Sequence, residues 1–367
     1  MNYHLASKIY TSIQTSYFGL KKIKIRIQRK MFKHVSDVFI PKPKNENVFD
    51  VNKFPAGYYK SFGEKNPDKI FYVIWLDRKG SGFFSNFSSV LCHLKIADDA
   101  GMIPVVDFQN FKTQYSEKNT IHNTGNAWEY YFKPVSPYTL DEVYKSKNVF
   151  FGTGTYPVSI GYNITEIEGL AEIYKKYIFL QPSVEEMIHS YSKKFNFGDK
   201  TLGVHFRGQE MKYAPKHPFP PSEKQMFKYT DEILKKYKLE KIFIVTEDQV
   251  YLDLFIEKYG NKVLYTDSFR TKKVNAYNLS PRENHRYLLG LNVLIDAFLL
   301  SKCNGLLCGD SNVSEFARFI KKFDFVYMIA NGFNAQNRLI ARHLYSIKKL
   351  LPPSFGGLSD QVTITET

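Results

Sequence analysis

The chain has 367 residues, 43% of them hydrophobic, and carries a formal net charge of +15. This length and composition are sufficient for two domains with their own cores, and they exclude a largely disordered chain. The positive charge favours polyanionic partners, among them nucleic acid, anionic lipid and a nucleotide diphosphate, without choosing between them. The three cysteines, Cys92, Cys303 and Cys308, exclude a disulfide framework and predict buried thiols in a reducing compartment.

Residues 1–65 differ from the rest and are predicted to form a basic extension and linker. Lys and Arg crowd residues 21–33, with Ile between them, in a pattern that fits either a strand or a basic interfacial helix. The segment is interpreted either as a solvated extension or as a surface that docks on anionic lipid through residues 1–35. No run of 18 apolar residues occurs, so we expect a cytoplasmic protein, with peripheral contact at the inner membrane face as the second interpretation.

Residues 66–190 are predicted to form a first, Rossmann-like domain. Continuous apolar runs at 70–76, 104–108 and 148–153 are typical of strands buried on both faces. Between the first two of these runs, apolar residues recur at helical spacing over 87–97, and Gly101 is expected to end that helix. The order strand, helix, strand predicts a parallel sheet.

Residues 191–350 are predicted to form a second domain, followed by a tail at 351–367. Strands and helices alternate along it, which indicates a doubly wound α/β fold. The predicted strands are 201–206, 241–246, 262–266, 305–308 and 324–329, and the predicted helices are 222–237, 249–259, 283–301 and 313–322. Ligands of such folds bind at the carboxyl ends of the strands, so chemistry is expected in the loops after Phe206, Thr246 and Cys308.

The first candidate segment is Gly203-Val-His-Phe-Arg-Gly208. His205 and Arg207 are two residues apart, so they point to the same face of a strand. The planar guanidinium of Arg207 suits a diphosphate. The alternative for Arg207 is a structural ion pair.

The second candidate segment is Val245-Thr-Glu-Asp248, at the end of the next predicted strand. Thr246 is placed to donate a hydrogen bond to a phosphate oxygen. Glu247 and Asp248 precede a predicted helix, where acids favour the positive end of the helix dipole. We therefore expect Asp248 to cap that helix rather than to take part in catalysis.

The third segment joins Asp296, which lies in an otherwise apolar predicted helix, to the loop Gly309-Asp-Ser-Asn312. A buried carboxylate needs a partner, either the N1–H and amino group of guanine or a nearby Lys or Arg. The loop joins a strand to a helix, and such helix starts suit phosphate. Asn312 and Glu315 have the spacing of a capping box.

A glycine-rich turn, Gly80-Ser-Gly-Phe-Phe-Ser-Asn86, opens the first predicted helix and contributes Gly82 and Asn86 as candidate site residues. It lacks the third glycine of a dinucleotide-binding motif. No Asp-x-Asp occurs in the chain, and no Cys/His zinc spacing or nucleophile elbow is present. The sequence therefore predicts no metal site, so Arg, Lys and helix amides would have to neutralise a leaving diphosphate.

Taken together, Gly203–Glu210, Phe243–Asp248 and Asp296 with Ser311–Ser314 resemble the three motifs of the fucosyltransferase superfamily. That superfamily includes the nodulation and core α-1,6-fucosyltransferases and the protein O-fucosyltransferases. The resemblance spans about residues 70–330. It implies a GT-B-like fold, with two Rossmann-like domains facing a cleft, and metal-independent, inverting transfer from GDP-fucose.

By the same resemblance, Arg207 would hold the β-phosphate, His205 would lie against the nucleotide, and Asp296 would read guanine. Thr246 and Ser311 would touch the phosphates, with Gly82 and Asn312 as further substrate-binding candidates. The family often has Arg-Thr-Asp after the phosphate-binding arginine, where this chain has Gly208-Gln209-Glu210. In place of the Lys and Glu that follow in the core-fucosylating members, this chain has Met211 and Pro215, so the family's catalytic base has no counterpart here. Asn86, Glu210 and His217 are the candidates for that role.

These observations predict a glycosyltransferase that moves a sugar, with fucose as the expected one, from a GDP-sugar to a cell-surface glycan or lipid-linked acceptor. No cofactor is expected besides this donor substrate. The alternative is a non-catalytic protein that binds nucleotide or glycan, which the changed residues at 208–211 motivate. A nucleic-acid partner is not expected, because no nucleic-acid-binding module is found and the charge is spread along the chain.

Overall fold

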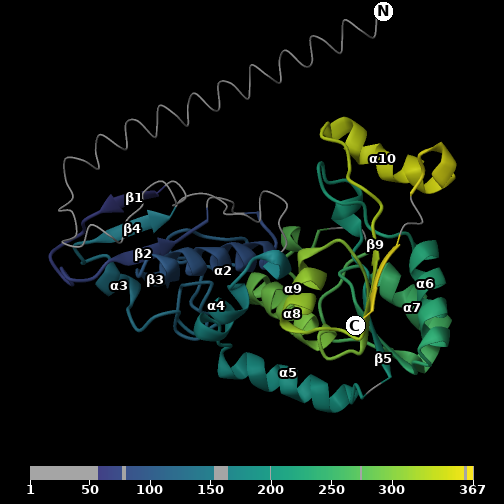
Figure 1. Cartoon of the computed structure of the whole chain (residues 1–367), viewed down its shortest axis with the longest axis horizontal. Coiled ribbons are helices and arrows are strands. Elements are labelled where there is room, and N and C mark those ends of the chain that lie inside the picture. The colour runs from purple at the N-terminus through teal and green to yellow at the C-terminus, as the bar shows by residue number, and fades with distance from the viewer. Residues whose placement is uncertain are drawn as a thin grey trace, which may run out of the picture. The chain divides into compact units, whose positions relative to one another are not determined.

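The structure, a computed structural model, describes residues 57–76, 80–152, 164–198, 200–272, 275–358 and 362–366 (Figure 1). By their internal contacts, these residues form two compact units, each built from several chain segments. The first contains 57–75, 96–105 and 136–152, and the second contains 76–95, 106–135 and the residues from 164 onward. The basic segment 21–33 lies outside the described residues, and the domain boundaries at 65, 190 and 350 stay predictions.

The first unit holds a sheet of four strands in the order β1-β4-β2-β3. Their bounds are β1 Gly57–Lys60, β2 Phe71–Ile74, β3 Ile103–Val106 and β4 Val149–Gly152. β2 pairs with β4 in parallel, whereas β1 pairs with β4 antiparallel. Residues 57–60 therefore belong to the sheet and not to a linker, because they pair with residues 149–152 of β4. The ring of Tyr58 also stacks on Phe151 with centroids 5.1 Å apart.

The predicted helix after the glycine-rich turn is α2 (Phe83–Asp99), and it ends as expected at Gly101. Gly101 has a φ of +64°, and the amide of Met102 donates to the carbonyl of Ala97 at 2.9 Å. This is the hydrogen bond with which a left-handed glycine closes a helix. A short helix, α3 (Leu140–Val143), precedes β4.

The second unit holds a six-stranded sheet in the order β10-β9-β8-β5-β6-β7. The strands are β5 Thr201–His205, β6 Lys241–Val245, β7 Val263–Leu264, β8 Gly305–Gly309, β9 Phe325–Ile329 and β10 Val362–Glu366. β5 to β9 pair in parallel, and β10 pairs antiparallel with β9, so residues 362–366 are an edge strand and not a free tail. The expected α/β class with mostly parallel sheets is confirmed.

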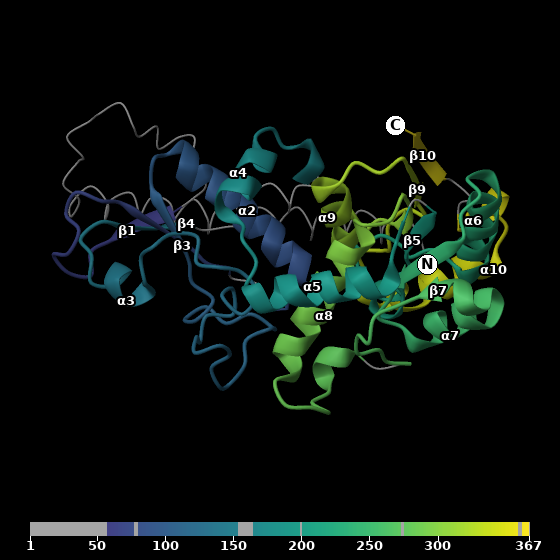
Figure 2. The ribbon, with the colours of Figure 1, turned by 90° about the horizontal axis from the view of Figure 1, so that it is seen from below.

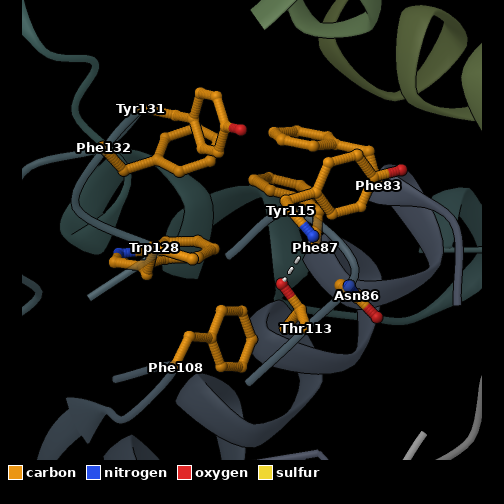
Figure 3. Close-up of a pocket in the computed structure, with 10 residues that line it drawn as sticks. Phe83, Asn86, Phe87, Phe108, Thr113, Tyr115, Trp128, Tyr131 and Phe132 are labelled. Atoms are coloured by element: carbon orange, nitrogen blue, oxygen red, sulfur yellow. Dashed lines mark hydrogen bonds between the residues drawn. The ribbon is translucent and has the colours of Figure 1, made fainter. Parts of the chain in front are cut away.

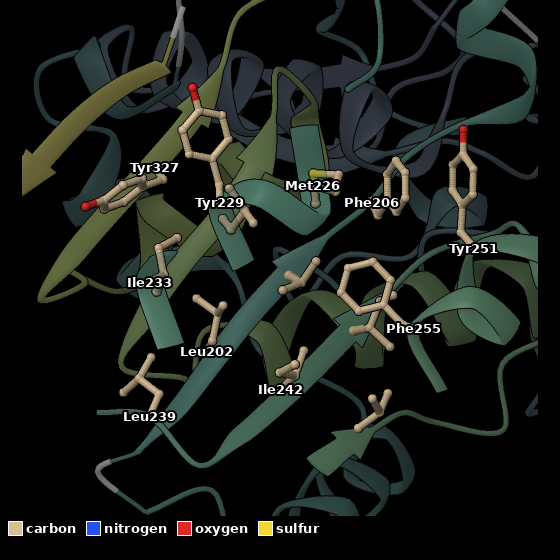
Figure 4. Close-up of a cluster of buried hydrophobic side chains, with 14 of the residues drawn as sticks. Leu202, Phe206, Met226, Tyr229, Ile233, Leu239, Ile242, Tyr251, Phe255 and Tyr327 are labelled. Carbon is tan, nitrogen blue, oxygen red and sulfur yellow. The ribbon is translucent and has the colours of Figure 1, made fainter. Parts of the chain in front are cut away.

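Helices pack on both faces of this sheet. On one face, α6 and α7 meet alternate residues of the strands in an apolar cluster that includes Leu202 and Phe206 (Figure 4). On the other face, Leu300 of α8 lies against the backbone of Gly203, where an added Cβ would come within 2.9 Å of it. Side chains two residues apart on a strand point to the same face, so His205 also faces α8.

The remaining helices complete the second unit. α5 packs across α8 (Figure 2). The helix bounds are α4 Leu170–Tyr177, α5 Pro182–Phe195, α6 Glu223–Lys236, α7 Gln249–Tyr259, α8 His285–Leu300, α9 Asn312–Ile320 and α10 Arg338–Leu350. Single 3-10 turns are η2 Ile164–Glu166, η3 Gln209–Lys212, η4 Gly260–Lys262, η5 Ala276–Asn278 and η6 Pro353–Phe355.

The three cysteines are buried free thiols, as predicted. Within the described part of the chain, no helix combines the length and the apolar character that crossing a bilayer requires.

Candidate active site

Three of the predicted segments meet at one edge of the second sheet. β5 lies between β6 and β8, and His205 is in register with Val245 on one side and with Cys308 on the other. All three strands run in the same direction, so Thr246, which follows β6, and Gly309, the last residue of β8, flank the end of β5. The structure thus brings the first two motifs and the loop of the third to the carboxyl edge, where doubly wound sheets bind ligands.

His205 is buried, and its Nδ1 has no hydrogen-bond partner among the described residues. Burial lowers the pKa of the imidazole to about 3, and the positive charge of Arg207 adds to the effect. The ring is therefore neutral near pH 7. A neutral, buried imidazole with an unpaired nitrogen is suited to a hydrogen bond with a ligand.

The depressed pKa of His205 predicts a loss of stability in acid. The neutral ring stabilises the fold fully above the unfolded pKa of about 6.5, and this contribution is lost as the pH falls towards 3. At pH 5 the loss reaches about 2 kcal/mol, so Tm should fall more steeply with acid in the wild type than in His205→Gln. Thermal scans from pH 7.5 to 4.5 measure this, with the exposed His189→Gln as the control. Parallel curves for the wild type and His205→Gln would contradict the assignment.

Arg207 follows β5 by two residues. Its Nε is buried without a hydrogen-bond partner, and no ion pair joins it to a carboxylate whose side chain the structure describes. The alternative role predicted for Arg207, a structural ion pair, is therefore not seen in the described part of the chain. A guanidinium in this situation retains its donors for an anion.

The charge of Arg207 acts on two tyrosines that sequence analysis missed. Burial raises the pKa of Tyr115 and of Tyr277, and the nearby Arg207 opposes the rise at both. Their hydroxyl oxygens are 2.6 Å apart. Burial and Arg207 also lower the pKa of His217, a candidate base. No local pattern signals Tyr115 or Tyr277, since they are 162 residues apart in the chain.

Most side chains of the second motif make hydrogen bonds to the backbone nearby. Asp248 caps α7, as predicted, by accepting a hydrogen bond from the amide of Val250 at 2.9 Å. Glu247 accepts from the amide of Gly208 at 3.0 Å and so ties the first motif to the second. The hydroxyl oxygen of Thr246 accepts from the amide of Asp248 at 3.1 Å, which leaves its proton available for a phosphate oxygen.

Gly208 is needed for the close approach of Tyr251. That ring stacks on Phe206 with centroids 3.7 Å apart, and a Cβ on Gly208 would lie 2.4 Å from its Cε2. Lys212 places its Nζ 4.8 Å from the centre of the Tyr251 ring. Burial lowers the pKa of Lys212, and this second cation near the sheet edge was also missed by sequence analysis.

Asp296 lies on α8 and is buried. One carboxylate oxygen accepts from the hydroxyl of Thr266 at 2.5 Å and the other from Ser268 at 3.0 Å. Burial raises the pKa of Asp296, and the positive charge of Arg270 opposes the rise. Because a carboxylate offers about four acceptor positions, both oxygens can accept one further hydrogen bond.

The loop after β8 differs in one detail from the prediction. Ser311, and not Asn312, caps α9: its backbone is extended, and its hydroxyl accepts from the amide of Val313 at 3.4 Å. Asn312 is the first helical residue. The capping box of Asn312 and Glu315 is therefore wrong, because the Glu315 carboxylate accepts instead from the amide of Ile164. Burial raises the pKa of Glu315 to about 7.

Asn86 lies in the first turn of α2, where its amide donates to the carbonyl of Gly82 at 3.0 Å. Its side chain is buried, and its Oδ1 has no partner among the described residues. Asn86 lines an aromatic cavity of about 20 Å³ together with Tyr115 and Trp128 (Figure 3). This volume suits about one water molecule, not a nucleotide or a sugar.

Glu210 belongs to η3, but its side chain lies outside what the structure describes. Within the described part of the chain, no group of three or more His, Cys, Asp and Glu residues is arranged to hold a metal ion.

No family model and no curated protein matches the chain. Its fold is similar to that of NodZ alpha-1,6-fucosyltransferase co-crystallised with GDP: the identity is 14%, the TM-score 0.47, and the match covers 81% of this chain and 98% of that one. Fucosyltransferase NodZ from Bradyrhizobium gives the same identity and TM-score, over 81% of this chain and 99% of that one. POFUT1 in complex with GDP gives 11% identity and a TM-score of 0.32, over 70% of each chain. These likenesses concern the fold, and no residue role follows from them.

Proposed function

We propose that the protein is a glycosyltransferase whose donor is a GDP-sugar, with fucose as the expected sugar. The observation that carries the proposal is Arg207, a guanidinium that makes no ion pair with the described carboxylates, beside the neutral His205 at the carboxyl edge of a parallel sheet. Such an arrangement suits the diphosphate of a sugar nucleotide better than a proton-transfer or metal centre.

In the proposed reaction, an acceptor hydroxyl attacks the anomeric carbon of the sugar while the bond to the diphosphate breaks. Negative charge then grows on the leaving phosphate, and Arg207 stabilises it most strongly in the transition state. The hydroxyl of Thr246 and the loop around Ser311 follow the neighbouring strand ends and would hold the same phosphates. His205 would lie against the nucleotide and donate or accept one hydrogen bond without changing charge.

Asp296 is proposed to select guanine through the acceptor positions that Thr266 and Ser268 leave open. The catalytic base is proposed among Asn86, Glu210 and His217. The pKa of His217 is lowered by burial and by the positive charge of Arg207. The acceptor is proposed to be a cell-surface glycan or a lipid-linked saccharide.

The test is calorimetry of GDP against UDP, ADP and CMP, each with and without magnesium. Selective binding of GDP that magnesium does not change is the expected result. Preferred binding of UDP, or no binding to any nucleotide, would refute the donor class. Release of GDP from GDP-fucose in the presence of acceptor then tests turnover.

A second candidate is a protein that binds the nucleotide without turnover. It is motivated by Gly208-Gln209-Glu210, which replace the residues that usually follow the phosphate-binding arginine in the superfamily. GDP-fucose that binds but is not consumed by any surface-glycan acceptor would favour this candidate.

A further inference from the structure

α10 packs one of its faces into the second unit. Ala341 and Tyr345, four residues apart, are buried, and Tyr345 forms a small apolar cluster with Phe219 and Leu358. The helix start is capped by Asn337, which accepts from the amides of Leu339 and Ile340. The buried face, with Ala341 and Tyr345, therefore packs α10 against the unit, and the exposed face is not needed for this packing.

The outer face of α10 is also apolar, and it is exposed. Leu339 and Leu350 are 76% and 85% exposed and lie about three turns apart, while Ile340 and Ile347, 55% and 51% exposed, lie about two turns apart. All four therefore share the side opposite Ala341. We call these four residues, together with the exposed Leu351 and Phe355 that follow α10 in the chain, the outer face. Exposed apolar side chains grouped in this way mark an interaction surface.

The charged side chains of α10 itself are all basic, although Lys349 forms an ion pair with Glu223 of α6 at 2.6 Å and Lys348 donates to the carbonyl of Gly356 at 2.7 Å. α10 carries Arg338, Arg342, Lys348 and Lys349, and no Asp or Glu occurs between residues 338 and 358. Arg338 and Arg342 are exposed. We propose that α10 docks the protein on an anionic lipid bilayer, with the outer face in the headgroup region and Arg338 and Arg342 on the phosphates. A basic amphipathic helix lying in the plane of the membrane binds in this way.

Two other partners for the outer face of α10 are less compatible with its positive charge. A second copy of the chain would bring one basic helix against another in a symmetric contact, which is electrostatically unfavourable. The segment at residues 21–33 has many Lys and Arg and no acid, so it repels α10 for the same reason. An anionic membrane has the complementary charge.

The docking helix is linked to the sheet edge described above. Tyr345 of α10 lies under Lys212, whose Nζ is 5.8 Å from the ring centre, and Lys212 ends the η3 turn that begins two residues after Arg207. Docking would therefore hold this edge near the lipid surface. The docking proposal does not depend on the transferase activity, since its test involves no sugar nucleotide.

The test is flotation of the full chain with vesicles of phosphatidylglycerol and phosphatidylcholine in equal amounts, and with vesicles of phosphatidylcholine alone. The wild type is expected to float with the first kind only. Leu350→Ser/Phe355→Ser is expected to reduce the partition coefficient at least about tenfold, because two large apolar contacts are lost. The matched control is Phe179→Ser/Met187→Ser, whose side chains are exposed on other parts of the unit, and it should bind like the wild type.

Unchanged flotation of Leu350→Ser/Phe355→Ser, equal binding to both kinds of vesicle, or no binding of the wild type would each overturn the proposal. So would a dimer in sedimentation equilibrium that this variant abolishes, because the outer face would then be a contact between copies. Unchanged thermal unfolding of the variant shows that its fold is intact, as expected for two exposed side chains.

Discussion

Replacing Arg207 with alanine should reduce glycosyl transfer at least about a hundredfold and leave the protein folded. Loss of one donor to the charge that develops in a transition state costs a factor of about 10²–10³. The fold should tolerate the change because the guanidinium has no carboxylate partner in the described part and its Nε is unpaired. Initial rates with GDP-fucose and a glycan acceptor, together with Tm, measure both effects.

Two companion variants sharpen this experiment. Arg207→Lys keeps the charge but loses the planar fork, so it should retain more GDP affinity than Arg207→Ala and still turn over slowly. Lys258→Ala removes a cation from an exposed ion pair with Asp231 on the same unit, and its rate should equal that of the wild type. Near-normal turnover of Arg207→Ala would refute the proposed mechanism.

The central strands of the second sheet could be predicted from the sequence to within about two residues. β5, β6 and β8 are continuous apolar runs because helices cover both of their faces, so almost every side chain is buried. The cap at Asp248 followed from its position before a helix. Each of these depends on local sequence.

One edge strand of each sheet, β1 and β10, could not be predicted in this way. β1 and β10 are antiparallel edge strands, and their partners, β4 and β9, are distant in sequence. Residues 362–366 are mostly exposed, so they lack the apolar run of a central strand. Only the neighbouring strand, and not local composition, makes them part of a sheet.

The same limit applies to the surroundings of the candidate site. Tyr115 meets Tyr277, and Asp296 meets Thr266 and Ser268, only after the chain has folded. The sequence predicted that a buried Asp296 needs a partner but left open which one. The structure supplies two hydroxyl donors and the nearby charge of Arg270, and two acceptor positions remain.

The remaining acceptor positions lead to a prediction about base selectivity. A carboxylate accepts from both the N1–H and the amino group of guanine, whereas an asparagine offers one acceptor and one donor. Xanthine has a carbonyl oxygen where guanine has its amino group, so it matches asparagine. Asp296→Asn should therefore weaken GDP binding about 10–100-fold and strengthen the binding of xanthosine diphosphate.

Calorimetry of both nucleotides with the wild type and Asp296→Asn measures this change of preference, and Thr266→Val is the control. Thr266→Val removes one hydrogen bond to Asp296 and should lower Tm while GDP remains preferred over xanthosine diphosphate. If Asp296 serves only to hold the loop that carries Thr266 and Ser268, Asp296→Asn will lower Tm like Thr266→Val and leave the preference unchanged. An exchange of preference without a matching loss of stability assigns the carboxylate to the base, because a purely structural group has no means of distinguishing an amino group from a carbonyl on the ligand.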